Sequence, residues 1–190
     1  MRTIGLIFSS INDRYIPELT AGRAMASVPF GGRYRLIDFV LSDMVAAGVS
    51  TVGIITKYNF QSLMDHVGSG KHWDLARKNG GIVFLPPYGS DSRMLYTSRF
   101  DALKSVLKFL KNSKEEVVIM SDCDFAAGID MNKAIDYFTE TGSDITLVYR
   151  DKTPDADEAN HRVALRVDGD RVVGIVPADR SRGVNMLYAN

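Results

Sequence analysis

The sequence predicts a three-layer α/β fold with a mainly parallel sheet, Rossmann-like in outline, and an antiparallel hairpin near the C-terminus. Short apolar runs typical of buried strands alternate with helical patterns of about 10–15 residues, as in parallel α/β sheets. Asp168-Gly169-Asp170 separates two apolar runs and indicates the hairpin. The chain has 190 residues, of which 45% are hydrophobic, so it can bury the core of such a fold.

The first half of the chain contains three predicted strands and two predicted helices. Residues 34–47 carry apolar side chains at helical spacing, and Gly48 follows them where a helix commonly ends. Asn59 is predicted to cap a second helix that runs to about residue 66. Residues 9–27 are irregular and rich in turn formers. The strands are predicted at residues 3–8, 51–56 and 82–85.

The second half begins with the strongest helical pattern, at residues 99–112. Its apolar stripe consists of Phe100, Leu103, Val106, Leu107 and Leu110. Asp130 is predicted to cap a helix over residues 131–141. Strands are predicted at residues 116–120, 145–149, 163–167 and 171–176.

Composition excludes several classes of protein. Lysine plus arginine equals aspartate plus glutamate at 23 each, so no net charge favours nucleic acid or an anionic membrane. No apolar run reaches the roughly 18–20 residues of a membrane span. The single cysteine, Cys123, excludes an internal disulfide and suits a reducing compartment. We expect a soluble, cytoplasmic protein that binds neither nucleic acid nor membrane.

Ligands of open α/β sheets bind beyond the carboxyl ends of the strands. Asp122 and Asp124 follow the predicted strand at residues 116–120, and Mg²⁺ or Mn²⁺ prefers such oxygen ligands. Metal-dependent nucleotide-sugar glycosyltransferases use an acidic pair of this kind. The alternative is a solvated turn before the helix at residues 131–141.

The loop at residues 9–14 follows the first strand, where a triphosphate is expected to meet backbone N–H groups. Glycine lets the backbone approach phosphate oxygens, but this loop has none before Gly22. Ile11 adds a branched side chain and Asp13 adds a negative charge. The residues predict a site that binds triphosphate poorly, or one that is built differently.

Two further patterns carry little chemistry. Gly68-Ser-Gly-Lys71 lacks the upstream glycine and the following serine or threonine of a phosphate-binding P-loop. His66, His72 and His161 have unrelated spacings, which predict neither a metal cluster nor a catalytic triad.

Three longer motifs carry a family resemblance. Residues 27–39 read SVPFGGRYRLIDF, residues 68–75 read GSGKHWDL and residues 80–88 read GGIVFLPPY. Together they resemble the ADP-glucose pyrophosphorylase family, the glucose-1-phosphate adenylyltransferases of glycogen and starch synthesis. The resemblance implies a nucleotidyltransferase-like domain over residues 1–190, Mg²⁺ as cofactor, and a β-helix domain further downstream. The stop at Asn190, inside a patterned segment, also suggests a truncated chain.

The chain departs from the family pattern where the family binds its nucleotide. Within residues 7–14 only Arg14, the family's pyrophosphate-side arginine, matches the family's first loop. Met25 stands where the family has a phosphate-facing lysine. Cys123 stands at the family's metal-binding aspartate, which leaves Asp122 and Asp124 as substitutes.

A later family motif, Gly-Thr-Ala-Asp-Ala, is also changed: Ser98 and Arg99 open it here, and Asp101 is kept. The resemblance therefore implies degenerate nucleotide-binding positions at Ser9, Ser10, Met25, Ser98 and Arg99. Arg14 and Asp101 are the vestigial catalytic candidates.

This pattern is similar to that of the regulatory companion subunits within the family. It implies a hetero-oligomer with a catalytic glucose-1-phosphate adenylyltransferase subunit, and Mg²⁺ serves the complex. The expected regulatory or interface residues are Arg33, Arg35, Lys71 and Trp73; packing is the alternative role for Trp73.

Three other functions stay open. The chain can be an active adenylyltransferase with a remodelled site. It can be a metal-dependent glycosyltransferase that uses Asp122 and Asp124. It can also sense a sugar phosphate in a pocket lined by Arg99, Arg162, Arg180 and Arg182.

Overall fold

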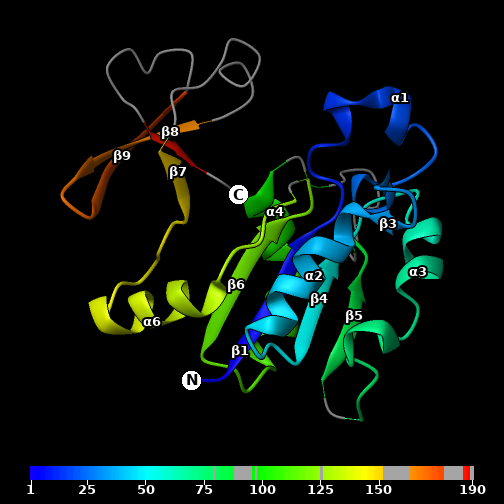
Figure 1. Ribbon diagram of the computed structural model, residues 1–190, viewed down its shortest axis with the longest axis horizontal. Helices are drawn as coiled ribbons and strands as arrows, with labels where there is room; N and C mark the ends of the chain where they lie inside the picture. The colour runs from blue at the N-terminus through cyan, green and yellow to red at the C-terminus, as the bar shows by residue number, and fades with distance from the viewer. Residues whose placement is uncertain are drawn as a thin grey trace. The chain divides into compact units, whose positions relative to one another are not determined.

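The computed structural model describes residues 1–78, 80–87, 96, 98–124, 126–151, 163–177 and 186–188. The chain forms two compact units, Met1–Met131 and Asn132–Asn190, which are treated separately below. Figure 1 shows the elements of each unit along the chain. Among the described residues, no helix is long and apolar enough to cross a membrane.

The first unit is built on a four-stranded sheet in the order β5-β4-β1-β6. Every neighbouring pair is parallel, which confirms the predicted parallel α/β arrangement (Figure 1). β1 lies inside the sheet, and its last residue, Phe8, is in register with Asp122 of β6. The strands are β1 Thr3–Phe8, β4 Thr51–Ile55, β5 Gly81–Leu85 and β6 Val117–Asp122.

Helices cover both faces of this sheet because its buried side chains alternate. On one face Ile7 and Ile54 pack in a cluster with α2 (Leu36–Ala46) and α3 (Gln61–Val67). On the other face Leu6, Phe8 and Ile55 pack with α4 (Arg99–Ser105) and α5 (Leu107–Lys111). Successive residues of a strand point to opposite faces, so β1 contributes to both clusters. The first unit therefore has the three predicted layers.

Short elements fill the connection after β1, which was expected to be irregular. They are η1 Asp13–Tyr15, α1 Pro17–Thr20 and η2 Met25–Ser27, followed by the paired strands β2 Pro29–Phe30 and β3 Tyr34–Arg35. A further short helix, η3 Lys71–Trp73, lies between α3 and β5.

The predicted start of α2 and the predicted cap of α3 are both wrong. Tyr34 and Arg35 belong to β3, and α2 begins at Leu36, where the Asp38 carboxylate accepts a hydrogen bond from the Arg35 N–H at 3.0 Å. Asn59 does not cap α3. Its backbone is left-handed at φ 55°, and its amide donates to the Ala21 carbonyl instead. Asn59 thus fastens the connection after β1.

The predicted helix at residues 99–112 is interrupted. Val106 separates α4 from α5 with φ −105° and ψ 6°. Two side chains of the predicted stripe are exposed, Phe100 at 67% and Leu107 at 42%. The residues that pack against the sheet are Ala102, Leu103, Val106, Phe109 and Leu110. The predicted stripe is wrong for Phe100 and Leu107, because the face that packs on the sheet is centred on Ala102, Val106 and Phe109.

The second unit contains α6 except for its first residue, and a four-stranded antiparallel sheet in the order β7-β10-β8-β9. α6, Met131–Thr141, has the predicted bounds. The hairpin of β8 and β9 is also confirmed, and Gly169 supplies its left-handed turn residue at φ 57°. The strands are β7 Tyr149–Asp151, β8 Val163–Asp168, β9 Arg171–Pro177 and β10 Met186–Tyr188.

The strand predicted at residues 145–149 is wrong except for its last residue. β7 begins at Tyr149, and the described residues of β10 pair with Tyr149–Asp151. Ile145 is instead exposed, as is Val148. An apolar run becomes a strand only where another strand supplies its hydrogen bonds.

Candidate functional site

The candidate site lies at the carboxyl edge of the first unit's sheet. β1 ends at Phe8, β4 at Ile55 and β6 at Asp122, so the segments that follow them meet there. This is the edge at which parallel α/β sheets bind ligands. The loops after Phe8 and after Met120 were predicted to matter, and both contribute.

Asp122 is the centre of a polar network at this edge. Its side chain is 2% exposed and forms an ion pair with Arg99 of α4. Nε of Arg99 donates to Oδ1 of Asp122 at 3.1 Å, and the terminal Nη2 donates to Oδ2. The amide of Asn12 donates to Oδ2 of Asp122 at 3.1 Å and to Oδ2 of Asp124 at 2.8 Å. The two carboxylates predicted to hold a metal therefore share one amide donor.

The electrostatics of the network follow from burial. Burial raises the pKa of Asp122, while the Arg99 guanidinium and the Asn12 amide oppose that rise. Arg99 supplies the positive charge that a buried carboxylate needs. Among the described residues, no group of three or more His, Cys, Asp or Glu side chains could hold a metal ion.

Cys123, between the two aspartates, faces the protein interior. Its thiol is buried and donates to the Ser9 carbonyl at 3.4 Å. Burial, with the charges of Asp124 and Asp122, raises the pKa of the Cys123 thiol well above its ordinary value. The thiol is therefore protonated at neutral pH and poorly nucleophilic.

The start of the loop after β1 is held by its own hydrogen bonds. Ser9 and Ser10 are both buried, and their hydroxyls lie 3.0 Å apart. The Ser9 hydroxyl and its N–H both donate to the Ile55 carbonyl, at 2.8 and 3.1 Å. The Ser9 carbonyl accepts the Ala26 N–H at 3.0 Å. These donors serve the fold and are not presented to a phosphate.

Asp13 is a second buried carboxylate of this region. Oδ1 of Asp13 accepts the backbone N–H of Met25 at 2.9 Å. Oδ2 is buried and has no hydrogen-bond partner among the described residues. Burial raises the pKa of Asp13 to about 6, while the Met25 N–H and the charge of Lys57 act in the opposite direction. The loop after β1 thus carries a buried negative charge at neutral pH.

Lys57 and Met25 flank this carboxylate in different ways. The Lys57 ammonium lies 5.2 Å from the ring centroid of Tyr96, and burial lowers the pKa of Lys57. The Met25 side chain is 4% exposed and packs in the hydrophobic core. Sequence reasoning missed Lys57, whose signal is its position two residues after the buried end of β4.

The remaining predicted nucleotide and catalytic residues serve local structure. Arg14 is exposed; its guanidinium lies 4.9 Å from the Tyr15 ring centroid and donates to the Tyr15 hydroxyl. Ser98 caps α4: its hydroxyl accepts the Asp101 N–H at 3.1 Å and donates to the Asp101 carboxylate at 2.9 Å. Arg162, Arg180 and Arg182, with His161, lie outside the described residues.

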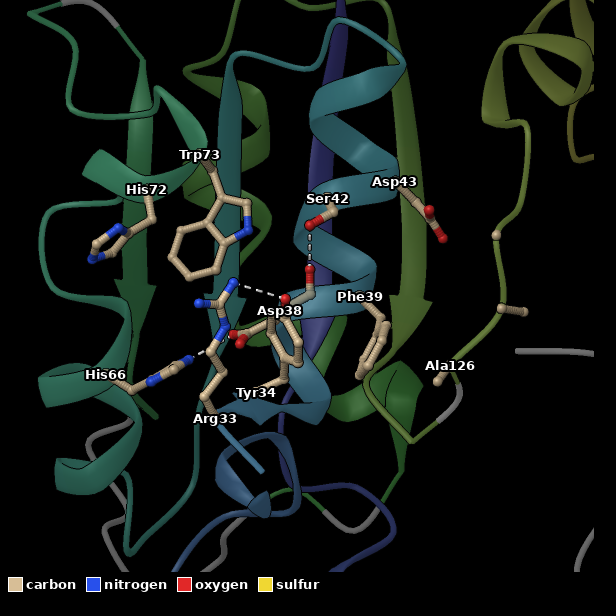
Figure 2. Close-up of a pocket in the computed structure, with 12 residues that line it drawn as sticks. Arg33, Tyr34, Asp38, Phe39, Ser42, Asp43, His66, His72, Trp73 and Ala126 are labelled. Carbon is tan, nitrogen blue, oxygen red and sulfur yellow. Dashed lines mark hydrogen bonds and ion pairs between the residues drawn. The ribbon is translucent and has the colours of Figure 1, made fainter. Parts of the chain in front are cut away.

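A cavity of about 760 Å³ lies elsewhere in the first unit, beside α2, α3 and η3. Figure 2 shows that Arg33 and Trp73, two of the four predicted interface residues, both reach it. Arg35 does not line it, because its side chain donates to the carbonyl and hydroxyl of Ser62 at 2.6 and 2.7 Å. Lys71 does not line it either.

Other residues of this cavity were not predicted. Nε2 of His66 lies 2.6 Å from Oδ1 of Asp38 in the cavity wall (Figure 2). Phe39 stacks edge-on against Phe30 with centroids 5.5 Å apart, and the exposed Tyr34 ring lies nearby. The motif at residues 27–39 could have indicated this group, because it combines aromatic and charged side chains at a helix start.

The comparisons with known proteins agree with this architecture. Residues 14–176 match the family model described as nucleotidyl transferase. A solved structure described as a glucose-1-phosphate thymidylyltransferase of Bacillus anthracis shares the fold at a TM-score of 0.74. The match covers 98% of this chain and 69% of that chain at 13% sequence identity.

Curated relatives are closer in sequence. The chain is 35% identical over 148 residues to the glycogen biosynthesis protein GlgD of Bacillus subtilis, covering 78% of this chain and 43% of that protein. It is 41% identical over 145 residues to the glucose-1-phosphate adenylyltransferase of Thermotoga neapolitana, covering 76% of this chain and 34% of that protein. The chain thus spans less than half the length of these relatives. Because the family match covers most of its residues, this chain belongs to the nucleotidyl transferase family.

Proposed function

We propose that this chain is the nucleotidyltransferase-like part of a regulatory or structural subunit of glucose-1-phosphate adenylyltransferase in glycogen biosynthesis. Its own catalytic activity is weak or absent, and it acts on a catalytic partner subunit in a hetero-oligomer. The reaction of the complex is ATP plus glucose 1-phosphate giving ADP-glucose and pyrophosphate, with Mg²⁺ to neutralise the phosphate charge.

The observation that carries the proposal is the hydrogen bonding at the carboxyl edge of the sheet. Asp122 is engaged by Arg99 and Asn12, and Ser9 directs its N–H and its hydroxyl to the Ile55 carbonyl. Loss of one transition-state donor typically lowers a rate by about 10²–10³. Several such groups are occupied here at once, which favours a rate close to background.

The relatives support the pathway and the partner. GlgD of Bacillus subtilis and of Geobacillus stearothermophilus are named as glycogen biosynthesis proteins, and the other close relatives are glucose-1-phosphate adenylyltransferases. A companion subunit descended from the enzyme would keep such similarity to both groups. The cavity that contains Arg33 and Trp73 is the proposed contact with the partner.

Co-expression with a catalytic glucose-1-phosphate adenylyltransferase of the same organism tests the proposal. We expect the two chains to co-purify, and the rate of pyrophosphate release or its response to effectors to change several-fold when this chain is present. This chain alone should give no release above background. Rapid turnover by the chain without a partner would overturn the proposal.

An active adenylyltransferase with a remodelled site is the second candidate. The observation that favours it is the 41% identity to the Thermotoga neapolitana adenylyltransferase, which exceeds the 35% identity to GlgD. An active site of this kind would bind ATP with Mg²⁺ at micromolar to millimolar concentrations. Calorimetric titration of the isolated chain with ATP and Mg²⁺ separates the two candidates.

A further inference from the structure

The chain carries its own cation where a nucleotidyl transferase is expected to hold a metal. Nucleotidyl and phosphoryl transfer place Mg²⁺ between carboxylates and phosphate oxygens, and Asp122 and Asp124 were the predicted ligands. Both oxygens of Asp122 accept hydrogen bonds from Arg99, and Oδ2 also accepts one from Asn12. The residues present therefore do not fit a divalent cation at Asp122 in this arrangement.

We infer that Arg99 is an internal substitute for a divalent metal ion: its guanidinium neutralises the buried Asp122 and keeps cations out of the acidic pair. Two parallel N–H donors meet the two carboxylate oxygens, which is the strongest arrangement that arginine makes with a carboxylate. Asn12 then ties Asp122 to Asp124 and fixes the geometry of the pair.

The position of Arg99 in its helix supports this role. Arg99 is the first residue of α4, where the helix dipole favours a negative side chain over a positive one. Local helix stability therefore does not account for an arginine there. Its ion pair with a 2% exposed carboxylate does, because removal of one partner would leave a buried charge without compensation.

The other carboxylate retains the capacity to take a cation. Oδ2 of Asp124 accepts from Asn12, but its Oδ1 is buried and makes no hydrogen bond among the described residues. Removal of the guanidinium would thus leave two neighbouring carboxylates with no positive charge between them. The inference predicts that Mn²⁺ enters only then.

Thermal unfolding with and without Mn²⁺ tests the inference on four forms of the full chain: wild type, Arg99→Ala, Asp122→Asn and the double variant. Arg99→Ala should lower the Tm by roughly 5–15 °C because Asp122 loses its counter-charge. The double variant should recover most of that loss. Saturating Mn²⁺ should raise the Tm of Arg99→Ala by several degrees and leave the wild type and the double variant unchanged.

Paramagnetic resonance of free Mn²⁺ measures binding directly in the same samples. Arg2→Ala removes an exposed arginine just before β1, at the opposite end of the strands from Asp122, and should leave both measurements unchanged. Wild-type binding of Mn²⁺ as tight as that of Arg99→Ala would overturn the inference. So would a double variant as unstable as Arg99→Ala, or one that fails to fold where Asp122→Asn folds.

The inference does not depend on the companion role. A wild-type chain that binds Mn²⁺ would remove the role of Arg99 without deciding whether the chain acts through a partner. Co-expression decides that question by the rate of pyrophosphate release.

Discussion

Asp13 shows how a single buried residue makes the stability of this chain depend on pH. Its pKa is about 6 in the folded chain, compared with an ordinary value of 3.8. Between these two pH values the folded state binds the proton more tightly than the unfolded state does. The free energy of unfolding therefore falls as pH rises from about 4 through about 6.

Asp13→Asn should remove this dependence. The amide oxygen can still accept the Met25 N–H, while the buried charge is gone. We expect the free energy of unfolding at pH 7.5 to rise by about 1–3 kcal/mol relative to the wild type, with little difference at pH 4. Urea denaturation at several pH values measures this. Asp136→Asn, in an exposed part of α6, is the control, and an equal gain in that variant would refute the role of Asp13.

Cys123 leads to a second prediction at this scale. Because burial raises the pKa of its thiol, iodoacetamide should alkylate the folded chain at least ~100-fold more slowly than the chain unfolded in guanidinium. Mass spectrometry of timed samples gives both rates. Equal rates in the two states would show that the thiol is accessible and that its contact with Ser9 is wrong.

At the scale of elements, the face that α4 and α5 turn to the sheet decides which of their side chains stabilise it. Phe100 is exposed beside Lys104, whereas Phe109 packs against the sheet. A Cβ on Gly53 would lie 2.9 Å from the Phe109 ring, which shows how closely this helix approaches β4. The two phenylalanines are therefore chemically identical probes of opposite environments.

Phe109→Ala should cost about 2–4 kcal/mol of unfolding free energy, and Phe100→Ala less than about 0.5 kcal/mol. Chemical denaturation of both variants under one condition measures the difference. Burial of the predicted stripe would reverse the expectation for Phe100, so comparable losses in the two variants would contradict the observed packing of α4 and α5 on the sheet.

At the scale of the whole molecule, two places in the first unit differ in what they offer a ligand. At the carboxyl ends of the strands the polar groups hydrogen-bond to one another, and a cavity lies elsewhere. The cavity combines aromatic side chains with Arg33 and the Asp38–His66 pair. Aromatic residues and arginine dominate the energetics of protein interfaces. This composition is why the proposed partner contact is assigned to the cavity.

Trp73→Ala should weaken binding of the catalytic subunit by roughly 10–100-fold. Sedimentation or surface plasmon resonance with purified partner measures the dissociation constant. Lys108→Ala, on α5 and therefore on the opposite face of the sheet, should bind as the wild type does. Unchanged affinity in Trp73→Ala would assign the contact to another surface and would favour packing as the role of Trp73.

The sequence by itself determined the elements whose signals are local. The runs at β1, β4 and β5 alternate with helical periods, and Gly169 marks a hairpin, so the parallel sheet and the antiparallel pair could be predicted. The family could also be predicted from the sequence, because each of its motifs is a contiguous stretch of residues. Local patterns failed where a distant hydrogen-bond partner decides the conformation, as at Asn59, which bonds to Ala21, and at residues 145–148, which are not part of a strand.

Only the tertiary structure decided what the site residues do. Arg99 and Asp122 are 23 positions apart, and Asn12 and Asp122 are 110 apart, so no local pattern could pair them. The sequence indicated that Arg99 and Asp122 stand near the nucleotide site, but it could not show that one neutralises the other. The physical reason is that a buried charge takes whichever partner the fold brings within hydrogen-bond distance, and the parallel sheet, not the order of residues, sets that distance.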